Sequence, residues 1–154
     1  MMERMVELES ASVADTLSVG RRLAGLLQPG DVVLLNGRLG SGKTVFASGV
    51  AEGLGIDGPI PSPSFLLVRT YRGFLPLIHA DAYRLGSAAE FEDLDVYEQG
   101  RSGVLVVEWG EAIAAAVGED RLEILMEIIG EDQRKISFVP RGSWQSRPLQ
   151  ELVA

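Results

Sequence analysis

The segment of this chain best suited to chemistry is a glycine-rich loop from Gly37 to Thr44. It reads Gly-Arg-Leu-Gly-Ser-Gly-Lys-Thr and is separated by one residue from the apolar run 32–35, and this G-x-x-x-x-G-K-T spacing is typical of a phosphate-binding loop. Glycine lets the backbone adopt conformations closed to other residues, so that consecutive N–H groups and the next helix converge on phosphate oxygens. Lys43 adds a positive charge for the outer phosphates, and the Thr44 hydroxyl is a suitable ligand for Mg²⁺. The loop therefore predicts binding of ATP or GTP.

The flanking pattern favours this interpretation over an ordinary glycine-rich turn that happens to carry Lys-Thr. Phe46, Val50 and Leu54 recur every four residues after the loop, as on one face of a helix that Gly55 ends. We expect the nucleotide to contact the loop and the residue after it, namely Gly37, Leu39, Gly40, Ser41, Gly42, Lys43, Thr44 and Val45.

Hydrolysis of a bound nucleotide needs more than this loop, because Mg²⁺ and a group that orients the attacking water are also required. Two strand-like runs end on a carboxylate, one at Asp81 and one at Glu108. Ligands of open α/β sheets gather beyond the carboxyl ends of the strands, so we predict both acids as catalytic. For Glu108 the alternative is a strand-end acid bonded to a neighbouring helix, and for Asp81 spacing alone does not decide. His79 lies two residues before Asp81 on the same side of the strand, but a single histidine is more often structural, and we leave it out.

Two further features have an open interpretation. Ser62-Pro63-Ser64 ends a Gly/Pro-rich loop and offers a hydroxyl or a carbonyl near the γ-phosphate, as switch loops do, although alone it is an ordinary turn. Trp109 follows Glu108. If the strand continues, packing on the opposite face is the default and contact near the nucleotide is the alternative.

The rest of the chain supplies elements that would position these groups. Ser12 to Asp15 matches a helix capping box, and apolar residues with helical spacing follow until Pro29-Gly30. The strands that we expect cover residues 32–35, 65–71, 75–80, 104–107, 122–129 and 134–139. The pattern predicts an α/β three-layer sandwich of the P-loop NTPase type, with a mainly parallel sheet and antiparallel edge strands. The tail from residue 142 is uninformative.

Composition narrows the classes of function. A chain of 154 residues suits a single domain. Its net charge of −8, from 14 Lys+Arg and 22 Asp+Glu, argues against charge-driven binding to nucleic acid or to anionic membranes. There is no cysteine, which excludes disulfides and thiolate metal sites. No apolar stretch has the length of a signal peptide or a membrane span, so we expect a cytoplasmic protein.

Four motifs in order resemble the TsaE family, the small bacterial ATPase of the machinery that makes threonylcarbamoyladenosine in tRNA. The motifs are residues 37–44, 62–65, 79–85 and 107–109, and the similarity covers roughly residues 13–139. The resemblance implies an ATPase that is slow alone. It also implies two partners, the tRNA-modifying threonylcarbamoyl transferase subunit and its inactive paralogue.

By the same resemblance, Thr44 and Glu108 hold Mg²⁺, Asp81 supports catalysis in the second switch-like segment, and Ser64 lies in the first. The family also implies that adenine lies between the N-terminal segment and the last strand pair, where Arg134 is a candidate contact.

The chain departs from the family at two positions. Ser64 stands where threonine is usual, and Arg38 stands where an acidic residue is common. Two alternatives stay open: a small-molecule kinase, although we see no lid-like insertion, and a nucleotide-dependent docking module that does not hydrolyse. The acidic segment 87–99 is our candidate for a surface that faces a partner.

Overall fold

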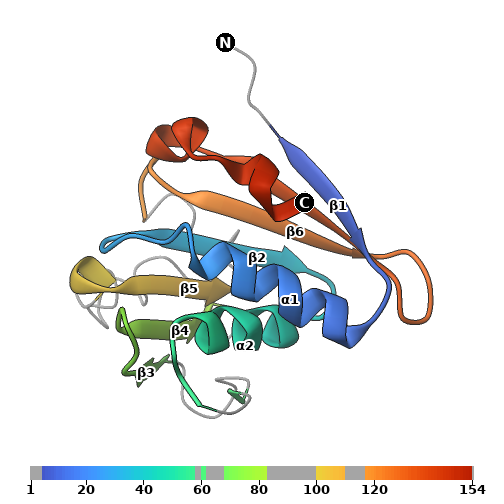
Figure 1. The fold of residues 1–154 in the computed structure, drawn as a ribbon, viewed down its shortest axis with the longest axis horizontal. Coiled ribbons are helices and arrows are strands. Elements are labelled where there is room, and N and C mark those ends of the chain that lie inside the picture. Colours follow the sequence, from blue (N-terminus) through green and yellow to red (C-terminus); the bar gives the residue numbers. More distant parts are fainter. Residues whose placement is uncertain (1–4, 58–59, 62–67, 83–99, 110–116, 154) are drawn as a thin grey trace.

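The computed structural model describes residues 5–57, 60–61, 68–82, 100–109 and 117–153. Within them, seven strands form one sheet in the order β1-β7-β6-β2-β5-β4-β3 (Figure 1). The strands are β1 (Val6–Ser10), β2 (Val32–Gly37), β3 (Val68–Tyr71), β4 (Leu77–Asp81), β5 (Val104–Glu108), β6 (Leu122–Ile128) and β7 (Arg134–Pro140). The helices are α1 (Val13–Ala24) and α2 (Lys43–Gly53), with short 3-10 turns η2 (Gly100–Ser102), η4 (Gly142–Ser146) and η5 (Leu149–Val153).

The sheet is parallel at its centre and antiparallel at both sides. Strands β6, β2, β5 and β4 run parallel to one another, whereas β7, β1 and β3 pair antiparallel. The predicted α/β class is confirmed, but half of the strand pairs in the described sheet are antiparallel, so "mainly parallel" holds only for the centre. One cause is β1, which the sequence analysis did not include although Val6 and Leu8 alternate with the charged Glu7 and Glu9, as in a half-buried edge strand.

Both described helices cover the same face of the sheet (Figure 1). The start of α1 confirms the predicted cap. The Ser12 hydroxyl accepts a hydrogen bond from the Asp15 N–H at 3.1 Å, and the Asp15 carboxylate accepts one from the Ala11 N–H at 2.9 Å. The first of these bonds satisfies an N–H group that a helix start leaves without a partner, and the second ties the residue before the cap to the first turn.

Helices α1 and α2 touch backbone to backbone. A Cβ atom on Gly20 would lie 2.5 Å from the Phe46 carbonyl oxygen, and one on Gly49 would lie 2.3 Å from the Leu17 carbonyl oxygen. Because no side chain fits at these separations, glycine is required at both positions. The contact fixes α2, the helix that follows the phosphate loop, against α1.

Alternate residues of the central strands contribute to two apolar clusters, one on each face of the sheet. Val33 and Leu35 of β2 belong to the cluster beneath the helices, and Val32 and Leu34 belong to a second cluster on the opposite face. A helical layer over this second face is not among the described residues, so the third layer stays a prediction. In the described part of the chain, no helix is long and apolar enough to cross a membrane.

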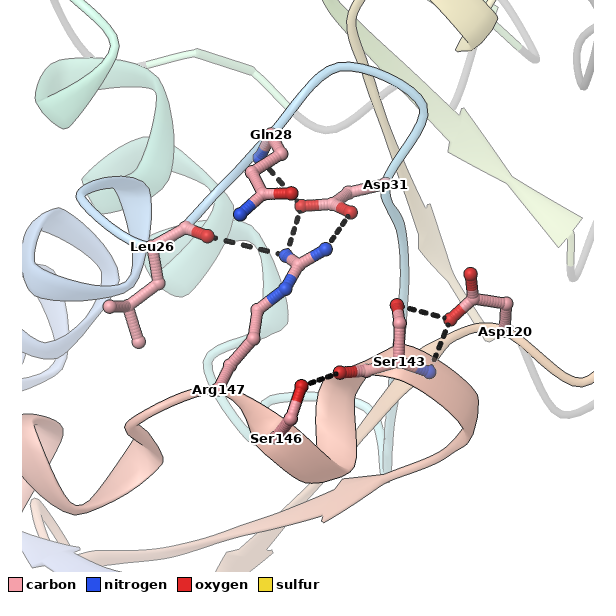
Figure 2. A network of polar contacts seen from close by, with 7 residues as sticks. All are labelled: Leu26, Gln28, Asp31, Asp120, Ser143, Ser146 and Arg147. Atoms are coloured by element: carbon pink, nitrogen blue, oxygen red, sulfur yellow. Dashed lines mark hydrogen bonds and ion pairs between the residues drawn. The ribbon is translucent and has the colours of Figure 1, made fainter.

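The C-terminal residues, which gave no signal in the sequence, pack onto the core. Trp144 in η4 is 1% exposed. Arg147 donates to both carboxylate oxygens of Asp31, with Nη2 2.7 Å from Oδ1, and to the Leu26 carbonyl oxygen at 3.2 Å (Figure 2). Its guanidinium also lies 3.9 Å from the centre of the Trp144 ring. The tail is therefore held to the start of β2.

Candidate nucleotide site

The glycine-rich loop joins β2 to α2 at the carboxyl end of the parallel strands (Figure 1). Gly40 and Gly42 have φ angles of 82° and 100°, in the left-handed region that favours glycine. Gly42 is the residue before the first turn of α2, and among the residues that the structure describes no side chain caps this helix. The first turn also contains no acidic residue. The positive end of α2 is thus left for an external anion.

Lys43 is nearly buried beside the loop. Its Nζ donates to the carbonyl oxygens of Gly37 at 2.6 Å and Arg38 at 3.1 Å, and lies 3.9 Å from the centre of the Trp109 ring. Trp109 has a φ of 61°, which is rare for a bulky side chain, directly after the last residue of β5. Of the two interpretations of Trp109, the structure favours contact near the phosphate loop, through a cation–π interaction with Lys43.

Glu108 connects the loop helix to the neighbouring strand. The Thr44 hydroxyl lies 3.1 and 3.2 Å from its two carboxylate oxygens, and His79 Nε2 lies 2.6 Å from Oε2. Asp81 is the cross-strand neighbour of Glu108 in the parallel β4–β5 pair, and both acids are buried. The structure therefore brings Thr44, Asp81 and Glu108 together at the edge where the sequence placed them.

His79 is the member of this group that sequence reasoning left out. It is fully buried, and within the described residues its Nδ1 has no hydrogen-bond partner. Toward an ionised Glu108 carboxylate, which only accepts hydrogen bonds, the imidazole has to donate from Nε2. The spacing of His79 and Asp81 was a signal, but its meaning depends on the register of β4 against β5.

The donor set of Thr44 and Glu108 fits Mg²⁺, a hard cation that prefers oxygen ligands. Among the residues that the structure describes, no group of three His, Cys, Asp or Glu side chains could hold a metal by itself. Magnesium in nucleotide sites needs only one or two protein ligands, because phosphate and water oxygens supply the rest. A hydroxyl and a carboxylate that already share a hydrogen bond satisfy this requirement.

Two hollows flank the loop. The smaller one, of about 200 Å³, lies where the family resemblance implied adenine, and its lining comprises Ser12, Val13, Thr16, Gly40, Gly42, Val45, Asp132 and Arg134. The larger one, of about 450 Å³, is lined by Gly37, Arg38, Trp109, Leu125, Met126, Glu127 and Ile128. Both open beside the loop, but of the two only the smaller one lies between the N-terminal segment and the last strand pair, the location that the family resemblance implied for adenine.

Some predicted features lie outside the described residues. These are Ser64 with its motif 62–65, residues 83–85 of the motif 79–85, and the acidic segment 87–99. Arg134 is described, and its guanidinium contacts carbonyl oxygens of the loop.

The mixed α/β sheet, the glycine-rich loop and the carboxylate at the next strand end define a nucleotide-binding protein of the P-loop type. The family model described as "Threonylcarbamoyl adenosine biosynthesis protein TsaE" matches residues 10–136. The chain belongs to the TsaE family.

Individual relatives agree with this assignment. The tRNA threonylcarbamoyladenosine biosynthesis protein TsaE of Bacillus subtilis is 37% identical over 150 residues, which cover 97% of this chain and 94% of the relative. The protein of the same name from Streptomyces coelicolor is 46% identical over 113 residues, or 71% and 76% of the two chains. The crystal structure of Bacillus subtilis YdiB superimposes with a TM-score of 0.81 at 36% identity, covering 99% of this chain and 96% of that one.

Proposed function

We propose that this protein is a P-loop ATPase required for the threonylcarbamoyladenosine modification of tRNA. It binds and hydrolyses ATP with Mg²⁺ in a complex with the threonylcarbamoyl transferase subunit and its inactive paralogue. The family membership supports the pathway. The observation that carries the chemistry is the contact of Thr44 with Glu108 directly beside the uncapped start of α2.

Each residue of the site has a task in this proposal. The loop N–H groups and the start of α2 bind the phosphates, and the smaller hollow holds the adenine. Lys43 exchanges its two carbonyl partners for phosphate oxygens, which carry more negative charge. Bound Mg²⁺ would neutralise charge that develops on the phosphates during cleavage.

The buried acids act on the reacting end of the nucleotide. Thr44 and Glu108 hold the metal, and His79 fixes the orientation of the Glu108 carboxylate through its Nε2–H. Asp81, the cross-strand neighbour of Glu108, orients the attacking water. The protein alone hydrolyses ATP slowly, and its partners accelerate this hydrolysis. The transfer of the threonylcarbamoyl group takes place on the transferase subunit.

We propose that residues 1–154 form a single domain and that the protein acts in the cytoplasm. The net charge of −8 gives no broad attraction to the tRNA phosphates. Contact with tRNA is therefore made through the partners.

The deciding experiment measures phosphate release from ATP by the protein alone and with the two partner subunits. We expect slow release alone and faster release in the complex. If ATP binds but no phosphate appears even with both partners, the protein is a docking module. If phosphate is transferred to an added small-molecule acceptor, the protein is a kinase.

A further inference from the structure

Arg134, the first residue of β7, joins two separate parts of the backbone. On one side, Nε donates to the Ser41 carbonyl oxygen at 3.1 Å, and Nη2 donates to the Gly40 carbonyl oxygen at 3.2 Å. On the other side, Nη1 donates to three carbonyl oxygens of the β6–β7 turn, in residues 130–133, at 2.9 to 3.2 Å. All three nitrogen atoms of the guanidinium therefore contact main-chain oxygen.

The orientation of these carbonyls decides where the loop N–H groups point. In a planar trans peptide the C=O and the following N–H point in opposite directions. With the Gly40 and Ser41 carbonyls turned toward Arg134, the N–H groups of Ser41 and Gly42 point away from it. The Ser41 N–H donates to the Arg38 carbonyl oxygen at 3.0 Å and so closes the loop on itself. The Gly42 N–H is directed to the side away from Arg134.

The orientation of these loop peptides has to be fixed by contacts from outside the loop. The two peptides that Arg134 contacts lie between Gly40 and Gly42, both at positive φ. Glycine rotates through its allowed conformations at little cost. If the Ser41–Gly42 peptide turned over, a carbonyl oxygen would face the phosphates in place of the Gly42 N–H group. If the Gly40–Ser41 peptide turned over, the loop would lose the bond from the Ser41 N–H to the Arg38 carbonyl oxygen. The guanidinium charge opposes this rotation and also polarises the peptides, which makes their N–H groups better donors.

We propose that Arg134 is a positioning residue that sets the peptide orientation of the phosphate loop from outside, and that it does not read the adenine base. This inference deepens the proposed function and rests on its nucleotide site. It differs from the role that the family resemblance implied, because the guanidinium nitrogens bind loop and turn carbonyls.

The test compares two ligands that share phosphates but not a base, ADP and inorganic tripolyphosphate, by titration calorimetry. We expect Arg134→Met to weaken both by about tenfold or more, the value of a lost hydrogen bond to a charged group. Arg134→Lys should lie between this variant and the wild type, because one ammonium group cannot contact both segments as the planar fork does. Weakened ADP binding with unchanged tripolyphosphate binding would show that Arg134 reads the base and would overturn the inference.

A second measurement does not depend on any ligand. Hydrogen–deuterium exchange of the free protein should be faster across residues 37–44 in both Arg134 variants than in the wild type. Lys135→Met is the matched control, since Lys135 is the next basic residue of β7 and pairs with Glu7 and Glu127. Loop exchange in the Arg134 variants that equals this control would overturn the inference. If the wild type binds neither ligand, the proposed function is wrong. The hydrogen–deuterium exchange comparison still tests the role of Arg134 in that case.

Discussion

Replacing Arg147 by alanine tests how strongly the C-terminal tail is tied to the core. The substitution removes both hydrogen bonds to the Asp31 carboxylate and the contact with the Trp144 ring. The side chains of Arg147 and Asp31 are 11% and 7% exposed, so water replaces little of what is lost. Asp31 keeps the hydrogen bond from the Gln28 N–H at 2.7 Å, but it has lost the cation that balanced its charge.

The expected cost follows from this burial. Removing one partner of a buried ion pair costs about 3–5 kcal/mol, because an uncompensated charge stays inside the protein. For a chain of this size, that loss lowers the midpoint of thermal unfolding by roughly 6–20 °C. The same substitution at Arg21 is the control, since its pair with Glu52 at 2.9 Å has side chains that are 42% and 51% exposed. Such a surface pair contributes about 0–1 kcal/mol.

Urea unfolding followed by circular dichroism measures both variants. A double variant, Arg147→Ala with Asp31→Ala, removes the unpaired charge and should be less destabilised than the two single variants added together. The reasoning is wrong if Arg147→Ala costs no more than Arg21→Ala, or if the double variant shows simple additivity.

The remaining predictions concern the site. Lys43→Ala should weaken ATP binding by about 1.5–3 kcal/mol, or roughly ten- to a hundredfold; unchanged affinity in calorimetry contradicts the role of Lys43. Glu108→Gln should keep ATP bound while phosphate release falls sharply, because the metal loses a charged ligand; wild-type turnover would move the metal role to Asp81. His79→Leu should raise the Mg²⁺ concentration needed for half-maximal turnover. His79→Gln keeps an N–H donor and is the control. If His79→Leu raises this concentration no more than His79→Gln does, His79 does not position the Glu108 carboxylate. Gly49→Ala should destabilise the fold by about 1–3 kcal/mol through overpacking. Wild-type stability of this variant in urea unfolding would refute the prediction.

The features that sequence predicted are those whose meaning is local. The phosphate loop is recognisable because its glycines, Lys43 and Thr44 act within eight neighbouring positions. Asp81 and Glu108 were found because carboxyl ends of parallel strands meet at one edge of a sheet. The pairing of β4 with β5 then brings the two acids into register.

The features that were missed depend on contacts between distant positions. His79 reaches Glu108 across 29 residues, and Arg147 reaches Asp31 across 116. The family resemblance implied Arg134 as a candidate contact for adenine, whereas the loop carbonyls that its guanidinium contacts lie 93 and 94 residues earlier and left no sign in the sequence. The sequence gives the chemical type of each side chain, whereas the tertiary structure determines which residue it contacts.

The glycine contact between α1 and α2 has a mechanical consequence. With backbone against backbone at Gly20 and Gly49, the two helices have no layer of side chains on which to slide. Any displacement of α2 would therefore have to move α1 with it. Arg22 of α1 donates to the Leu152 carbonyl oxygen at 2.5 Å, so such a displacement would also pull on η5, which lies far from α2 along the chain but is bonded to its neighbouring helix.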